Sequence, residues 1–128
     1  MTAPGERSLA HWLSDIVEWS LRIERHIAGL TEAQFAEDPK TQDAVIRCIE
    51  CIGESAKQIL AFKAQLGIEE ASSDFFEAYW ARNRLAHGYF DVDVSRVWLT
   101  ATVSVPRLSA HVNAMLIRRT AAGDDEKP

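Results

Sequence analysis

The sequence predicts an all-α protein, an up-and-down bundle of four main helices. Apolar residues recur at three- and four-residue steps over long stretches, and the alternation typical of strands is nearly absent. Residues that cap or end helices stand at the borders of these stretches. A chain of 128 residues can bury a core without disulfides or metals. We expect a single helical domain over residues 1–120 and a flexible polar tail over residues 121–128.

The first helix is expected to start after Ser8 and to stop near Gly29. Its apolar stripe consists of Leu9, Leu13, Ile16, Ser20, Ile23 and Ile27. A connector over residues 31–39 has room for a single helical turn around residues 33–36.

The second helix is expected from about Thr41 to Gln65, with Gly67 closing it. Gly53 and Ala56 share one side of this helix, and both are small. We therefore expect another helix to approach closely there.

The third helix is expected to open near Ser73 or Asp74, where Glu77 stands in capping-box spacing, and to end near Gly88. The last helix is expected over residues 94–117, capped by Asp91 or Asp93. Pro106 lies inside it, which predicts a kink or break nearby.

Composition limits the possible functions. The net charge of −5 argues against a protein that coats nucleic acid nonspecifically, although a nuclease needs only a local cationic pocket. No stretch resembles a signal peptide or a membrane span, so we expect a cytoplasmic protein that does not insert into membranes. Cys48 and Cys51 form a CxxC pair inside a helical apolar pattern, which favours small, partly buried side chains over a redox or zinc site.

The most informative segment runs from Trp80 to Phe90 and contains Arg82, Asn83, His87 and Tyr89. Arginine is a permanent cation that can offset charge on a phosphorane, and histidine can remove a proton from a ribose 2′-hydroxyl near neutral pH. Asn83 could orient the histidine or a phosphate oxygen. The alternative is purely structural: a histidine at a helix C-terminus interacts favourably with the helix dipole, and Tyr89 packs like any aromatic residue.

Helical geometry constrains this segment. Asn83 and His87 are four residues apart and share a face, whereas Arg82 lies roughly 140° from His87 around the helix. A symmetric dimer, in which the helix packs against its two-fold mate, would line one cleft with both kinds of side chain.

The spacing Arg82-x4-His87-Gly88-Tyr89 resembles the Arg-x4–6-His-x-Tyr motif of HepT-like toxins in the HEPN superfamily. The run Ile49–Lys57 resembles the family's helix with a Gly-Glu-Ala-like signature. The segment Phe90–Asp93, followed by Val97 and Trp98, resembles the start of its last helix. These three blocks stand in the family's order within residues 8–118.

The resemblance implies a HEPN-like homodimeric endoribonuclease toxin, the toxin of a type II toxin–antitoxin pair whose antitoxin is a minimal nucleotidyltransferase. It implies that Arg82 and His87 are the ribonuclease residues, supported by Asn83. It also implies that the antitoxin attaches AMP to Tyr89 and thereby silences the toxin. We expect cleavage of RNA through the 2′-hydroxyl without a metal or other cofactor.

Other residues have two interpretations each. Glu50 and Glu54 either hold Arg82 or Arg84 in place or form a solvated acidic face, and Arg47 shares that face. Arg84 either contacts phosphate or is simply solvated. Three further histidines lack the spacing of metal ligands and are interpreted as structural or surface residues: His11, His26 and His111.

The alternative function is a non-catalytic helical binding module that partners a nucleotidyltransferase and presents Tyr89 to it. Loss of RNA cleavage in a His87→Ala protein, with Tyr89 still modified, would distinguish the enzyme from such a module.

Overall fold

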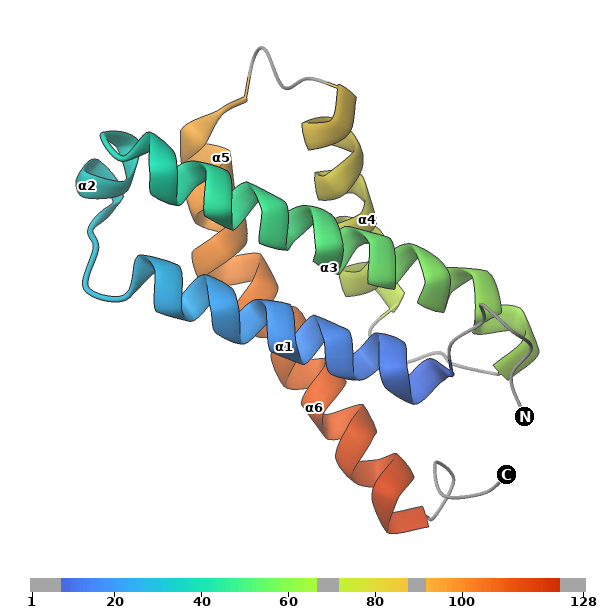
Figure 1. Ribbon diagram of the computed structural model, residues 1–128. Coiled ribbons are helices and arrows are strands. Elements are labelled where there is room, and N and C mark those ends of the chain that lie inside the picture. Colours follow the sequence, from blue (N-terminus) through green and yellow to red (C-terminus); the bar gives the residue numbers. More distant parts are fainter. Residues whose placement is uncertain (1–7, 67–71, 88–91, 123–128) are drawn as a thin grey trace.

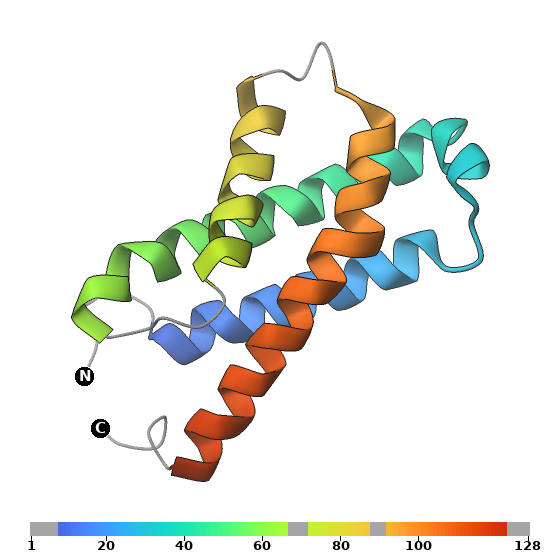
Figure 2. The same cartoon turned by 180° about the vertical axis from the view of Figure 1, so that it is seen from behind.

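The computed structural model describes residues 8–66, 72–87 and 92–122, and all the regular structure in these ranges is helical. The prediction of an all-α bundle is therefore confirmed. Two layers cross each other (Figure 1): α1 and α3 lie side by side in one layer, and α4 lies with the continuous rod α5–η2–α6 in the other. Figure 2 shows the second layer from its own side.

Helix α1 spans Leu9–Ile27. The Ser8 side chain accepts a hydrogen bond from the His11 backbone amide, so Ser8 is the N-cap that the sequence predicts. Gly29 adopts φ +78° just beyond the helix, a conformation that favours glycine. The predicted stripe faces the core, and the buried Ser20 hydroxyl donates to the Ile16 carbonyl oxygen at 2.7 Å.

Helix α2 spans Glu32–Ala36 and fills the connector, as predicted. Thr31 and Gln34 form a reciprocal capping box at its start. Helix α3 follows over Pro39–Leu66, slightly longer at both ends than predicted. The Asp38 carboxylate accepts from the Thr41 amide at 3.1 Å and from the Thr41 hydroxyl at 2.6 Å, so Asp38 caps α3. The predicted stop at Gly67 lies outside the described residues.

Helix α4 spans Ser72–His87. Asp74 therefore lies within the first turn, not before it, and the prediction that Asp74 and Glu77 form a capping box is wrong. Both carboxylates instead bind side chains of α6, as described below.

The last helical rod begins at Asp93, whose side chain accepts from the Arg96 amide. It consists of α5 (Val94–Leu99), a π-helical segment η2 (Thr100–Ser104) and α6 (Val105–Ala122). The irregularity expected near Pro106 is this π turn, because proline has no N–H for the α-helical ladder. The helix changes its hydrogen-bond register there and continues. Beyond α6, residues 123–128 lie outside the described ranges.

The core lies between the two layers. Its fully buried large side chains come from five helices: Leu13, Ile16, Ile23, Phe35, Val45, Ile52, Ile59, Phe75, Leu108 and Val112. Trp98 packs against this core, and its ring centroid lies 5.2 Å from that of Phe35. In the part of the chain that the structure describes, no helix is long and apolar enough to cross a membrane.

Candidate active site

The contact between α3 and α4 places Arg82. A Cβ atom built on Gly53 would lie only 2.2 Å from the Arg82 Cβ and 3.0 Å from the Ala78 carbonyl oxygen. Only glycine fits between the two helices at that point. This confirms the close approach that the sequence predicts, and it brings α4 alongside the neighbour of Gly53 in the chain, Glu54.

Two neighbours hold the Arg82 guanidinium group. Its Nη2 lies 3.5 Å from Glu54 Oε1, and its Nη1 donates to Asn83 Oδ1 at 3.3 Å. Both side chains of the ion pair are partly exposed, 32% for Arg82 and 39% for Glu54. The pair therefore adds little to stability and mainly fixes the direction of the cation. Of the two interpretations of Glu54, this geometry favours the one in which it holds Arg82.

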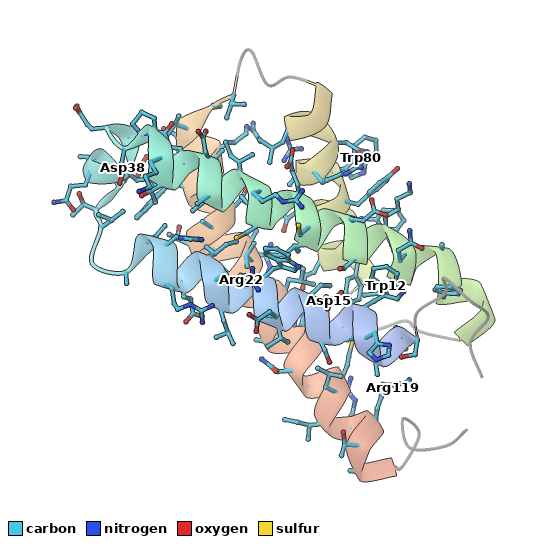
Figure 3. All side chains as sticks on the ribbon, viewed as in Figure 1. Trp12, Asp15, Arg22, Asp38, Trp80 and Arg119 are labelled. Atoms are coloured by element: carbon cyan, nitrogen blue, oxygen red, sulfur yellow. The ribbon has the colours of Figure 1, made fainter. Side chains whose placement is uncertain are left out.

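Arg82 faces an open groove of about 460 Å³ between α1 and α3. The groove is lined by Trp12, Asp15, Trp19, Arg47, Glu50, Cys51, Glu54, Ser55 and Arg82. Trp12 and Asp15 lie between the two helices in Figure 3, and Arg22 stacks on the Trp19 ring at 4.5 Å. Glu50 and Arg47 thus lie in the same groove as Glu54, as their shared helix face predicts.

His87 and Tyr89 are the remaining predicted residues of the site. The backbone places His87 as the last residue of α4, five positions after Arg82. Five residues of a regular helix turn through about 140°, so positions 82 and 87 are on different sides of the α4 backbone. The side chain of His87 and the whole of Tyr89 lie outside what the structure describes.

Arg84 takes a different side of α4 from Arg82. It lines a second, smaller groove between α4 and the α5–η2 rod, together with Arg96 of α5. The structure thus separates the two arginines that the sequence places two residues apart.

A polar cluster that the sequence did not predict lies between α4 and α6. Arg107 Nε lies 3.2 Å from Asp74 Oδ1, and its Nη2 lies 2.5 Å from Glu77 Oε1. His111 Nδ1 contacts the other Asp74 oxygen, so His111 is a structural residue with a partner more than thirty positions away. The only signal of this cluster in the sequence was the four-residue spacing of Arg107 and His111. This spacing does not indicate that Asp74 and Glu77 are their partners.

The two cysteines are free, Cys48 buried and Cys51 partly buried. Burial raises the pKa of both thiols, which disfavours the reactive thiolate. This confirms the interpretation of the CxxC pair as packing residues. In the described ranges, no group of three or more histidine, cysteine, aspartate or glutamate side chains could hold a metal ion.

Comparison with known proteins identifies the family of this chain. The family model described as "Ribonuclease HepT-like" matches residues 16–115. A protein of Thermococcus cleftensis named "Probable ribonuclease HepT" is 37% identical over 103 residues, covering 80% of this chain and 91% of its own. Two proteins of Methanocaldococcus jannaschii, named as candidate RNases MJ1216 and MJ0125, are 28% and 30% identical. These alignments cover 94% and 80% of this chain, and 96% and 86% of theirs.

No solved structure matches. The family model spans α3 and α4 entirely, and with them the Gly53 contact and the Arg82–Glu54 pair. The chain belongs to the ribonuclease HepT-like family, and is thus a member of a family of RNA-cleaving enzymes.

Proposed function

We propose that this ribonuclease cleaves RNA through the ribose 2′-hydroxyl, with Arg82, His87 and Asn83 as its catalytic residues. The observation that carries the proposal is the fixed guanidinium group of Arg82, held by Glu54 and Asn83 at the edge of an open groove. A pre-oriented cation facing a groove suits the stabilisation of charge that develops in a transition state.

The chemistry needs one proton transfer in each direction. His87 takes the proton of the 2′-hydroxyl as O2′ attacks phosphorus. The bond from phosphorus to the 5′ oxygen breaks, that oxygen takes up a proton, and a 2′,3′-cyclic phosphate remains. Arg82 offsets the negative charge on the pentavalent phosphorus, and the amide of Asn83 keeps the arginine in place. The step needs no metal or redox cofactor.

We further propose a homodimer in which α4 packs against its mate. Phe76 and Trp80, four residues apart on α4, are 46% and 57% exposed. Figure 3 shows Trp80 on the side of α4 away from α5. Large exposed aromatic residues on one helix face are typical of interface anchors. Because Arg82 and His87 diverge around α4, a second copy would complete a cleft that one copy leaves open.

The dimer can be tested with a Trp80→Glu protein. We expect it to sediment as a monomer and to lose RNA cleavage, because a carboxylate cannot be buried at a two-fold axis beside its own copy. A Leu21→Glu protein, changed at an exposed apolar residue of α1, is the matched control and should remain dimeric. A dimeric Trp80→Glu protein would show that α4 does not form the interface.

The biological role that fits this activity is that of a toxin controlled by a minimal nucleotidyltransferase antitoxin. In this proposal the antitoxin attaches AMP to Tyr89, two residues beyond His87. A bulky anion at that point in the chain would hinder the approach of RNA by steric and electrostatic repulsion. Mass spectrometry of the protein produced with and without a co-expressed minimal nucleotidyltransferase tests this: a mass increase of AMP on Tyr89 is expected only in the first case.

Cleavage itself is tested with purified, unmodified protein in EDTA, beside Arg82→Ala and His87→Ala proteins. We expect only the unchanged protein to cut RNA, to leave cyclic phosphate ends, and to leave DNA of the same sequence intact. Equal cleavage by all three proteins would refute the proposed catalytic residues. Cleavage of DNA at a comparable rate would refute attack by the 2′-hydroxyl.

A further inference from the structure

The groove between α4 and the α5–η2 rod has the chemistry of a binding site. Its volume is about 190 Å³. Ile49 and Ile52 of α3 form an apolar floor, and both are buried. Figure 2 shows α4 and α5 standing apart from each other, both in front of α3.

The charges of this groove are unevenly compensated. Asp74 and Glu77 line one part of it, and both carboxylates are bound to Arg107. Arg84 and Arg96 line it as well and are exposed, and neither forms an ion pair within the described ranges. The groove therefore offers two cations, on two different helices, to an anionic ligand.

Hydroxyl groups complete the lining. Thr100 and Ser104 of η2 are both half-buried and border the groove. Guanidinium groups recognise phosphate oxygens, hydroxyl groups can bind a phosphate or a ribose, and an apolar floor suits the face of a base. The ligand class that satisfies all three is a nucleotide.

We infer that this groove binds one nucleotide of the single-stranded RNA substrate, with its phosphate at Arg84 and Arg96 and its base above the floor formed by Ile49 and Ile52. The inference rests on the proposed function, because a ribonuclease must hold RNA beyond the bond that it cuts. Arg84 lies two residues from Arg82 but on a different side of α4, so this groove is separate from the one that Arg82 faces.

The test measures RNA affinity as a function of salt. The probe is a short, fluorescein-labelled single-stranded RNA with 2′-O-methyl riboses, which cannot be cleaved through O2′. The full chain is titrated into it over a series of KCl concentrations, and anisotropy is recorded. Arg96→Gln is compared with Arg25→Gln, a matched change at an exposed arginine of α1 that does not line the groove.

Loss of one phosphate contact with a single strand reduces the slope of log affinity against log salt concentration by about 0.7. At 0.1 M salt this corresponds to about a fivefold loss of affinity. We expect this change for Arg96→Gln and for Arg84→Gln, and none for Arg25→Gln. Arg96→Lys should keep the slope, since the charge remains. Circular dichroism verifies that each variant is folded, and the two arginine sites provide independent tests.

Two results would overturn the inference while leaving the proposed function intact. The first is RNA binding by both groove variants with the affinity and salt slope of the unchanged protein. The second is a change in oligomeric state for these variants without a change in RNA affinity, because the groove would then belong to a contact between copies. If the unchanged protein neither binds nor cuts RNA, the proposed function itself fails.

Discussion

Replacement of Gly53 by alanine tests whether the α3–α4 contact sets the stability of the fold. The added Cβ would lie 2.2 Å from the Arg82 Cβ and 2.8 Å from its Cγ. Carbon atoms in contact prefer a separation of about 3.5–4.0 Å, so α4 must retreat by roughly 1.5 Å at this point. Neither obstacle can swing away, because one is a Cβ atom and the other, Ala78 O, belongs to the backbone.

Two opposing effects decide the result. Overpacking of this kind costs about 1–3 kcal/mol, and the rigid obstacles place this case at the upper end. Alanine is favoured over glycine in a helix interior by about 1 kcal/mol. We therefore expect Gly53→Ala to lower the free energy of unfolding by about 2 kcal/mol, measured by urea denaturation followed by circular dichroism.

Ala61→Gly, at an exposed position of the same helix, is the matched control. It should cost about 1 kcal/mol through helix propensity alone. If Gly53→Ala is as stable as the unchanged protein or more stable, propensity outweighs packing and the reasoning is refuted. We also expect Gly53→Ala to cut RNA more slowly, because the retreat of α4 displaces Arg82 from Glu54.

Three further predictions concern single side chains. Glu54→Gln should lower the turnover of RNA cleavage by about tenfold, equivalent to about 1.4 kcal/mol of transition-state stabilisation, with no change in Tm. An unchanged rate would refute the role of Glu54 in positioning Arg82. Glu18→Gln on α1 is the control. The hydrogen bonds from Thr41 hold the pKa of Asp38 below its ordinary value. The stability that they confer should be present above pH 4 and lost as the pH falls through that lowered pKa; Asp38→Asn should abolish this part of the acid dependence in denaturation experiments. Burial raises the pKa of the Cys51 thiol, so its alkylation by iodoacetamide at neutral pH should be slower than that of glutathione, and equal rates would contradict the assigned burial.

The elements that sequence reasoning predicted well are those fixed by local rules. The cap at Ser8, the stop near Gly29 and the cap at Asp93 depend on residues within one turn of the helix end. The close approach at Gly53 was also predictable, since a small residue in an apolar helical pattern indicates that another helix passes nearby.

The failures have a different cause. Asp74 and Glu77 carry the spacing of a capping box, yet their partners lie on α6. The capping-box spacing takes account only of backbone amides within one turn. It cannot show that these carboxylates form ion pairs with Arg107, which is distant in the sequence. Arg82 and Arg84 are two residues apart, about 200° around a helix, so they leave α4 on different sides. Which groove each one lines depends on how α3 and the α5–η2 rod pack against α4, which the sequence does not give.

The π turn at Thr100–Ser104 determines the directions in which the side chains of α5 point. A π turn holds one residue more than an α turn, and one residue corresponds to about 100° of helical phase. The side chains of α5 are therefore rotated by that angle from where an uninterrupted helix would put them, while those of α6 keep the phase that buries Leu108 and Val112. The extra residue therefore shifts the helical phase of α5 relative to α6. Arg96 faces α4, and the core contacts further along the same rod are kept.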